Sequence, residues 1–291
     1  KAIESYEIMY TAVGVNDNRP HARLKRISPL HALLAEKDAV HNVVQGYEKP
    51  LWFKTDLIRS EPPTWQRSQA HAAVADECAA VRDSAGIIDI SGAAKFEISG
   101  PEAAAFLDKL SSNKLPIKDG RMVLTLFHGP NGGIMTEQSI TRINEQLFYL
   151  IGPIASENRD LHWMQQHSSD FNVKIDNCTD HLGGVLLTGP NSRAILQQLT
   201  NSDLSAKAFP WLSCQNVKID SAQVRMLRVS YAGELGFELH MPGYQLVSLY
   251  QSLQRAGVGH GLRDFGGYAF NSLRMEKAYR AWGSEFTEEI S

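Results

Sequence analysis

The stretch Ile98-Ser-Gly100-Pro101-Glu-Ala-Ala-Ala-Phe106-Leu107 returns 89 residues later as Leu187-Thr-Gly189-Pro190-Asn-Ser-Arg-Ala-Ile195-Leu196. In both copies a β-rich run ends in Gly-Pro, which is typical of a strand that leads into a helix with proline at its first position. Small or apolar side chains then recur at the spacing i, i+3, i+4 and i+7 that marks one helix face. They are Ala103, Phe106, Leu107 and Leu110 in the first copy and Ser192, Ile195, Leu196 and Leu199 in the second. The chain therefore contains a repeated strand–helix unit.

Each copy of the unit leads to a β-hairpin. In the first copy the runs 123–127 and 134–142 flank a glycine-rich turn. In the second copy the hairpin is Tyr231-Ala-Gly233-Glu234-Leu-Gly236-Phe-Glu238, whose glycines supply the turn. A duplicated strand–helix–hairpin unit predicts an α+β fold of two related subdomains, with the repeats near 95–150 and 183–242. The cleft between such subdomains is the natural place for a ligand.

The second hairpin carries polar side chains that suit a heterocycle. Because side chains alternate along a strand, Glu238 and His240 point to one face and Phe237 and Leu239 to the other. We expect Tyr231 on the incoming strand, sharing a pocket with Glu238. A carboxylate and a phenol aimed at one cavity match a flat, amide-rich ring with paired N–H donors. By itself the pattern is more often that of a solvent-facing hairpin without a role.

Glu137 lies on the returning strand of the first hairpin, where the other residues are mostly apolar or hydroxyl-bearing. A carboxylate in a partly dry cleft can have a raised pKa and serve as an acid, a base or a stabiliser of a cation. The alternative is a solvent-facing strand residue. Both Glu137 and Glu238 stand an even number of residues past the turn glycine, so both could face the same side of their hairpins.

Composition and charge exclude several classes of function. The 291 residues are 43% hydrophobic and 21% charged, as in an ordinary globular protein, and the net charge of −3 gives no electrostatic reason to bind nucleic acid or a membrane surface. No apolar run approaches the ~18 residues of a membrane-spanning helix. The three cysteines, Cys78, Cys178 and Cys214, are far apart, which favours a reducing compartment. Neither they nor the ten histidines have the spacing of metal ligands, so we predict no metal site.

The remaining regions frame the repeats. Residues 1–64 form a leading segment whose prolines suggest extended chain laid across a surface. An alanine-rich helix is expected over 65–85, closed by Gly86. The chain starts at Lys1 and stops just after a helical pattern. We therefore expect a piece of a longer polypeptide.

These motifs together resemble the folate-binding module shared by the glycine-cleavage T-protein, an aminomethyltransferase, and the flavin-dependent dimethylglycine and sarcosine dehydrogenases. The resemblance rests on the second hairpin, on Gly132-Gly133-Ile134-Met-Thr-Glu137 and on Asn271-Ser-Leu-Arg274-Met-Glu276-Lys277-Ala-Tyr-Arg-Ala-Trp282-Gly283. The leading segment, with Arg26-Ile-Ser28-Pro29-Leu30 and Trp52-Phe53, is similar to the stretch that joins the flavin domain to the folate domain in the dehydrogenases. This points to the dehydrogenase branch.

The resemblance implies a role for each predicted site residue. Glu238 would accept hydrogen bonds from the pterin ring, and Tyr231 would line the same pocket. Glu137 stands where most of the family has aspartate, so its charge reaches one methylene further. Phe270 stands where the T-protein has a folate-binding arginine, so that contact would be absent. Arg274 and Glu276 would form a structural pair.

The resemblance also implies an architecture. The fold would consist of two duplicated ferredoxin-like subdomains over residues 65–291, and residues 1–64 would link them to an upstream flavin domain that holds FAD. The family continues into a third, barrel-like domain, which is missing from these residues. The rest of the site would come from the same polypeptide or from a flavin subunit.

The implied function is one-carbon transfer. The flavin would oxidise a small N-methylated amine such as dimethylglycine or sarcosine, and this chain would hold tetrahydrofolate to receive the one-carbon unit as 5,10-methylenetetrahydrofolate, with Glu137 as the catalytic carboxylate. Two alternatives stay open: a non-catalytic regulatory or assembly relative, and a folate-dependent aminomethyltransferase or demethylase. The expected location is the cytoplasm, with the mitochondrial matrix as the alternative.

Overall fold

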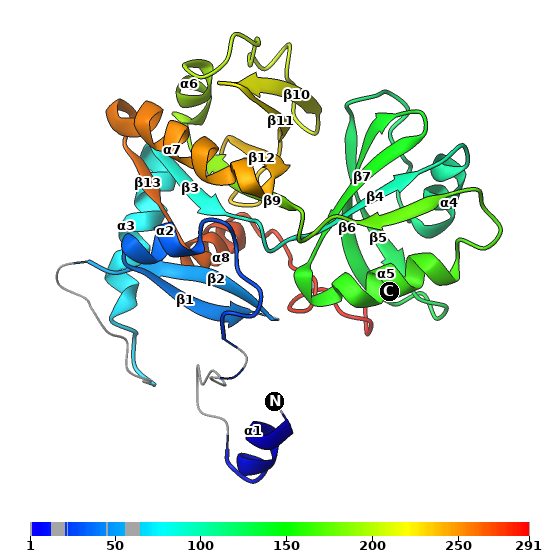
Figure 1. Cartoon of the computed structure of the whole chain (residues 1–291), viewed down its shortest axis with the longest axis horizontal. Helices are drawn as coiled ribbons and strands as arrows, with labels where there is room; N and C mark the ends of the chain where they lie inside the picture. The colour runs from blue at the N-terminus through cyan, green and yellow to red at the C-terminus, as the bar shows by residue number, and fades with distance from the viewer. Residues whose placement is uncertain (1, 13–20, 22, 45, 56–64, 291) are drawn as a thin grey trace.

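The computed structural model describes residues 2–12, 21, 23–44, 46–55 and 65–290 (Figure 1). Two β-sheets carry the fold. The six-stranded sheet and its helices fill the left half of Figure 1, and the five-stranded sheet with α4 and α5 fills the right half. Both sheets consist mainly of antiparallel strands accompanied by helices, so the predicted α+β class is confirmed.

The two sheets follow one order of elements. The five-stranded sheet has the order β5-β6-β7-β4-β8, and the six-stranded sheet has the order β10-β11-β12-β9-β3-β13. In both, a strand is followed by a helix, three antiparallel strands, a second helix and a last strand. The first run is β4 (Ala94–Ser99), α4 (Ala103–Leu110), β5 (Met122–His128), β6 (Ile134–Asn144), β7 (Leu147–Gly152), α5 (Glu157–Gln166) and β8 (Lys174–Asn177). The second run is β9 (Leu182–Thr188), α6 (Ser192–Gln197), β10 (Cys214–Ile219), β11 (Ala222–Leu227), β12 (Gly236–Pro242), α7 (Leu246–Gly257) and β13 (Leu262–Asp264).

This order corrects the predicted correspondence of the two hairpins. Glu137 lies on β6, the second strand after its helix, whereas Glu238 lies on β12, the third strand after its helix. By element order the counterpart of β12 is β7, which carries Tyr149. The error arose because turn glycines mark several hairpins in each run, and spacing alone does not say which of them correspond.

The glycine of each Gly-Pro pair is required by the backbone. Gly100 and Gly189 have φ angles of +132° and +112°, which L side chains rarely adopt. A Cβ on Gly189 would also lie 2.6 Å from the carbonyl oxygen of Val81. The helices begin two residues after the prolines, at Ala103 and Ser192, so proline marks the approach to the helix and not its first residue.

Each sheet has its own apolar core. The predicted helix faces are confirmed, because Phe106 and Leu107 of α4 and Ile195 and Leu196 of α6 are fully buried. Burial of one such side chain stabilises the fold by about 1.5–3 kcal/mol. On the other face of the six-stranded sheet a second apolar cluster joins α3 and α8 to β3 and β9, with Leu186 among its members.

The leading segment is more folded than predicted. It contains α1 (Ala2–Glu7), α2 (His31–Glu36) and an antiparallel hairpin of β1 (Ala39–Val44) and β2 (Tyr47–Phe53). Trp52 of this hairpin is 1% exposed and packs with Ala70 and Ala73 of α3. The prolines at 62 and 63 lie outside the described residues.

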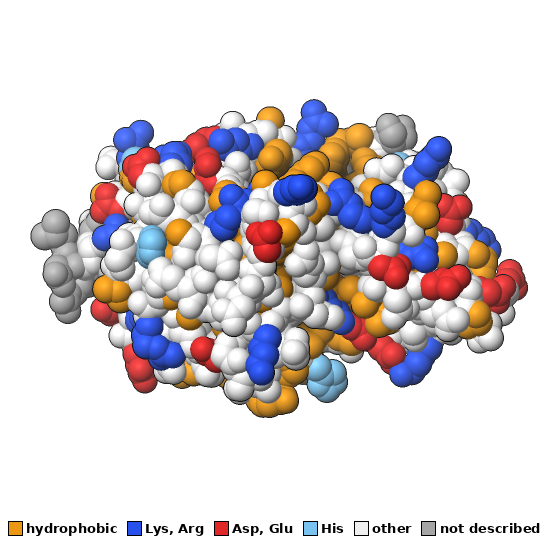
Figure 2. All heavy atoms as spheres, turned by 90° about the horizontal axis from the view of Figure 1, so that it is seen from above, with side chains coloured by type: hydrophobic (Ala, Val, Ile, Leu, Met, Phe, Trp, Pro, Cys, Tyr) orange, Lys and Arg blue, Asp and Glu red, His pale blue; other side chains and the backbone are white. Residues whose placement is uncertain are grey.

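The remaining elements complete the chain. They are α3 (Ala70–Asp83), β3 (Ala85–Asp89), α8 (Gly267–Glu276) and the 3-10 turns η2 (Ile154–Ser156), η3 (Gly243–Gln245) and η4 (Val258–His260). Across the described stretches, every helix falls short of the length and apolarity that a bilayer crossing needs. On the face drawn in Figure 2, basic and acidic side chains are interspersed with apolar ones.

Candidate functional site

Glu137 lies on β6, opposite Leu126 of β5. Residues of β6 alternate between buried and partly buried, and Glu137 shares the partly buried face with Met135 and Ser139. Burial raises the pKa of the Glu137 carboxyl. The side chain is therefore neither fully buried nor fully solvated, which is the environment predicted for an acid in a partly dry cleft.

The sequence predicts Tyr231 on the incoming strand, and this prediction is wrong. β11 ends at Leu227, which pairs with Glu238, and Tyr231 lies in the loop that follows. Backbone bonds of Arg228 to Leu212 and Ser213 extend the pairing of β11 with β10, and beyond them the chain leaves the sheet because Ala232 is fully buried in the cluster around α8.

The ring of Tyr231 lies among other aromatic side chains. It stacks on Tyr279 with the centroids 6.0 Å apart and lies 5.7 Å from Phe270. Its hydroxyl donates to the carbonyl oxygen of Arg280. Burial raises the pKa of Tyr231 to about 12, and the charge of Glu137 adds to this shift. Glu137 belongs to the five-stranded sheet and Tyr231 to a loop that leaves the six-stranded sheet, so the fold brings these two predicted residues into one neighbourhood.

Glu238 faces the junction between the two sheets. The predicted alternation along β12 is confirmed, since Phe237 and Leu239 enter the helix-covered core while Glu238 and His240 point to the other side. Oε2 of Glu238 lies 3.1 Å from Nε2 of His240. Nδ1 of His240 lies 3.0 Å from the hydroxyl of Tyr149, which belongs to β7 of the five-stranded sheet.

A buried lysine lies in the same region. Lys95 of β4 is fully buried and donates to the carbonyl oxygens of Ser91 and Ala93 at 2.8 and 2.9 Å. Burial lowers the pKa of Lys95 to about 8, against the carboxylates of Asp89 and Glu238, which favour its charged form. The surroundings of Glu238 are thus cationic as well as polar.

An ion pair also crosses the junction. Arg225 of β11 donates to Glu97 of β4 at 2.8 Å, and its guanidinium lies 4.3 Å above the ring of Tyr149. Sequence reasoning missed Tyr149, Arg225 and Lys95 because each stands within an apolar or strand-like run. The sequence places His240 on the face of Glu238 but assigns it no role.

The segment after α8 is anchored differently from the prediction. Arg274 pairs with both carboxylate oxygens of Glu285, at 3.0 and 3.2 Å, and Glu276 pairs with Arg82 of α3. The predicted Arg274–Glu276 pair is therefore wrong, because residues two apart on a helix do not share a face.

The same segment then reaches the five-stranded sheet. The carbonyl oxygen of Ile290 accepts a hydrogen bond from the backbone of Ile134, and Arg159 of α5 lies over the ring of Trp282 at 4.5 Å. This segment is drawn in orange to red in Figure 1 and passes below the junction of the two halves. It connects α8 to the strand of Glu137 and passes Tyr231 on the way.

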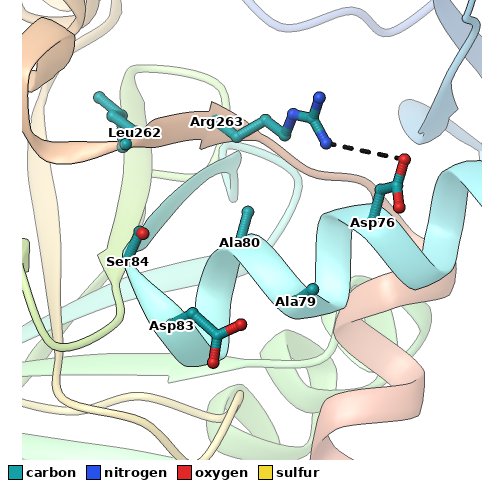
Figure 3. Close-up of a pocket in the computed structure, with 8 residues that line it drawn as sticks. Asp76, Ala79, Ala80, Asp83, Ser84, Leu262 and Arg263 are labelled. Carbon is teal, nitrogen blue, oxygen red and sulfur yellow. Dashed lines mark ion pairs between the residues drawn. The ribbon is translucent and has the colours of Figure 1, made fainter.

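A surface pocket lies elsewhere, between α3 and β13 (Figure 3). Its wall includes Asp76 and Arg263, whose charged groups are 4.0 Å apart. None of the three predicted site residues lines this pocket. Within the described ranges no three His, Cys, Asp or Glu side chains gather as they would around a metal ion.

Known proteins resemble this chain in sequence. It is 36% identical to the mitochondrial dimethylglycine dehydrogenase of Rattus norvegicus over 98% of its own length and 34% of that protein. It is 28% identical to the mitochondrial sarcosine dehydrogenase of Mus musculus over 99% of its length and 36% of that protein. It is 32% identical to an aminomethyltransferase of Thermoanaerobacter sp. (strain X514) over 78% of its length and 62% of that protein. The chain thus spans about a third of the length of the dehydrogenases that it matches.

A solved structure shares the fold. The crystal structure of the glycine cleavage system aminomethyltransferase T from Bartonella henselae superposes with a TM-score of 0.73 at 22% identity, over 87% of this chain and 63% of that one. The family described as the GCVT N-terminal domain matches residues 30–291. This chain therefore belongs to the GCVT N-terminal domain family, together with segments of dimethylglycine dehydrogenase, sarcosine dehydrogenase and aminomethyltransferase.

Proposed function

We propose that this chain is the tetrahydrofolate-binding part of a flavin-dependent dehydrogenase that acts on a small N-methylated amine such as dimethylglycine or sarcosine. The observation that carries the proposal is that the segment after α8 contacts both Tyr231 and the strand of Glu137, and that the charge of Glu137 acts on the Tyr231 phenol. The sequence relationship to dimethylglycine dehydrogenase over nearly the whole chain supports the dehydrogenase branch.

The side chains present fit a reduced folate. A pterin ring carries adjacent N–H donors, and a carboxylate accepts two parallel hydrogen bonds. Within the described part of the chain, Oε1 of Glu238 takes no hydrogen bond, and Oε2 takes one from His240. The ring of Tyr231 is partly exposed and lies beside Phe270, at the position where the T-protein has an arginine. Glu238 and Tyr231 would thus hold the ring by hydrogen bonding and by ring contact.

Glu137 would carry the chemistry of this chain. Bound tetrahydrofolate would supply a nucleophilic nitrogen that accepts the one-carbon unit and yields 5,10-methylenetetrahydrofolate. Glu137 would stabilise the positive charge that develops beside it and would hold the proton released on ring closure. Burial raises its pKa and so brings it nearer to the range in which a carboxyl exchanges protons. A well-placed group of this kind contributes roughly 10²–10⁴-fold.

The proposed architecture follows the family. Residues 1–64 would link to an upstream flavin domain, and residues 65–291 would form the folate-binding domain of two duplicated ferredoxin-like subdomains. The shared order of elements in the two sheets supports the duplication. FAD and the third, barrel-like domain would belong to the rest of the polypeptide, or to a flavin subunit, and would complete the site.

The compartment is proposed on two grounds. The three cysteines are free thiols, which suits the cytoplasm or the mitochondrial matrix. The dehydrogenases that this chain resembles are described as mitochondrial, which supports the matrix.

A second candidate is a folate-dependent aminomethyltransferase, supported by the 32% identity to such an enzyme. Experiments on the complete protein separate the dehydrogenase from the aminomethyltransferase. A dehydrogenase would purify with bound flavin, and addition of dimethylglycine would reduce that flavin. A non-catalytic relative would keep the fold and bind no folate.

Calorimetric titration with 5-formyltetrahydrofolate tests the proposal, on this chain and on the complete polypeptide. We expect Glu238→Gln to weaken binding ~10-fold or more, the loss expected for a hydrogen bond to a charged group. Glu145→Gln, an exposed glutamate in the turn after β6, serves as the control and should bind as the unmodified chain does. Failure of the complete polypeptide to bind the folate would refute the proposed function.

A further inference from the structure

The carboxylate of Glu238 is held by a hydrogen-bonded chain that begins in the other sheet. Tyr149 on β7 contacts His240 at 3.0 Å, and His240 contacts Glu238 at 3.1 Å. Tyr149 is fully buried and His240 is 1% exposed, so water does not compete for the contact between them. The side chain of Glu238 is 17% exposed and forms the solvent-facing end of this series of hydrogen bonds.

The chemistry of the three groups fixes the direction of the chain. A carboxylate only accepts hydrogen bonds, so Nε2 of His240 must carry the proton that it donates to Glu238. In a neutral imidazole the other nitrogen is then an acceptor, and the Tyr149 hydroxyl must donate to Nδ1. The order of donation is Tyr149 to His240 to Glu238.

The surroundings keep the imidazole neutral. Burial lowers the pKa of His240, and the nearby cations Lys95 and Arg225 act in the same direction, while Glu238 opposes them. Arg225 also lies over the Tyr149 ring and pairs with Glu97. The phenol, the imidazole and their charged neighbours thus come from both sheets and form one network at the junction.

We propose that His240 is a positioning residue, which is held at Nδ1 by the Tyr149 hydroxyl and whose Nε2–H holds Oε2 of Glu238 so that Oε1 faces a bound ring. This inference rests on the proposed folate site and adds the groups that orient its carboxylate. Without His240, Glu238 could rotate about its last torsion, and one defined acceptor geometry would become several. Ligand affinity then depends on how the two sheets are packed, because Tyr149 and His240 belong to different sheets.

Two matched substitutions of His240 test this assignment. The amide nitrogen of glutamine can take the place of Nε2, whereas the amide of asparagine reaches only the place of Nδ1. We expect His240→Gln to bind 5-formyltetrahydrofolate within about 3-fold of the unmodified protein and His240→Asn to bind ~10-fold or more weakly. Thermal unfolding of both variants checks that they remain folded.

A spectroscopic measurement tests the role of Tyr149 independently of binding. In protein labelled with nitrogen-15 in its histidines, the two ring nitrogens of His240 should report the tautomer with hydrogen on Nε2. Tyr149→Phe should leave the hydrogen on Nε2, which the carboxylate fixes, but should shift the Nδ1 signal, because Nδ1 loses the hydrogen bond from the phenol, and should weaken folate binding several-fold. Tyr250→Phe removes another buried phenol, whose hydroxyl donates to Asp264 at 2.6 Å, and should change neither property.

The outcomes separate this inference from the proposed function. If the complete protein binds the folate and Glu238→Gln weakens it, but His240→Asn binds as tightly as His240→Gln, His240 does not position the carboxylate. A hydrogen found on Nδ1 would also overturn the inference. If the unmodified complete protein binds no 5-formyltetrahydrofolate, both the proposed function and this inference are refuted. If His240→Asn does not fold, the comparison of Tyr149→Phe with Tyr250→Phe decides.

Discussion

The charge of Glu137 on β6 of the five-stranded sheet acts on the phenol of Tyr231, which lies in the loop between β11 and β12 of the six-stranded sheet. Burial is the larger cause of the raised pKa of Tyr231, and it raises the pKa of Glu137 as well. A partly buried environment of this kind strengthens the electrostatic interactions within it. A cation that develops beside Glu137 would be stabilised more there than in water.

Glu137→Gln is therefore expected to slow methylene transfer in the complete enzyme by ~10²–10⁴-fold at saturating folate, because the amide neither carries charge nor accepts a proton. Binding of 5-formyltetrahydrofolate should change far less than transfer does. Single-turnover formation of 5,10-methylenetetrahydrofolate measures the effect, with Glu145→Gln as the control. Transfer at the unmodified rate in Glu137→Gln would remove this carboxylate from the mechanism.

Tyr231→Phe is expected to loosen the segment that follows α8. The variant keeps the ring that stacks on Tyr279 but loses the hydrogen bond to the carbonyl of Arg280. Loss of one such bond costs about 1 kcal/mol. Amide hydrogen exchange over residues 278–290 should become faster, while the strands keep their protection. Tyr244→Phe, which alters an 84% exposed tyrosine, serves as the control. Unchanged exchange in Tyr231→Phe would mean that other contacts hold the segment.

The sequence was informative where structure is local. The helix faces of α4 and α6 and the alternation that turns Glu238 and His240 to one side follow from periodicity, and both are present in the fold. Tyr231 could not be placed in this way, because the burial of Ala232 against α8 pulls the loop out of the sheet. That contact joins distant parts of the chain.

The contact between Tyr149 and His240 could not be predicted either, because it also joins residues that are distant in the sequence. Tyr149 stands in the run Leu147-Phe-Tyr-Leu-Ile151, which is typical of a core strand. Nothing local indicates that its hydroxyl meets His240. The predicted roles of Glu137, Tyr231 and Glu238 toward folate stay predictions until the binding and transfer experiments are made.

Glu77 of α3 should make stability depend on pH. It is 3% exposed, and its oxygens accept hydrogen bonds from the backbone of Phe53 and Gly266, both at 2.8 Å. Burial outweighs these bonds and raises the pKa of Glu77 from 4.5 to about 7. Between these values the folded protein keeps a proton that the unfolded chain releases, so the free energy of unfolding falls as the pH rises. The contribution lost from pH 4.5 to 7 is about 3 kcal/mol.

Glu77→Gln removes this titration. We expect the variant to be less stable than the unmodified protein at pH 5, because the amide NH₂ faces a backbone N–H, a cost of roughly 1–3 kcal/mol. The deficit should shrink or reverse by pH 7.5, where the unmodified protein holds a buried charge. Urea unfolding at the two pH values measures the difference, and an equal deficit at both would contradict the assignment.

Gly86 was predicted to end the alanine-rich helix, but α3 ends at Asp83 and Gly86 lies within β3. Its role is close packing, since a Cβ there would lie 2.4 Å from Cγ2 of Val81 and 2.7 Å from Cδ1 of Phe265. Both neighbours are buried and cannot move aside without disturbing the cluster that joins α3 and α8 to the sheet.

Gly86→Ala is therefore expected to lower the free energy of unfolding by about 1–3 kcal/mol, the usual cost of an overpacked core. Gly259→Ala is the matched control, because a Cβ at that position meets nothing within 4 Å. Chemical denaturation of both variants measures the contrast. β3 pairs with β9, and β9 pairs with β12, which carries Glu238 and His240. Strain at β3 therefore has a path to these two residues, and Gly86→Ala should also weaken folate binding. Equal stability of the two variants would show that Val81 and Phe265 make room for the methyl group at no cost.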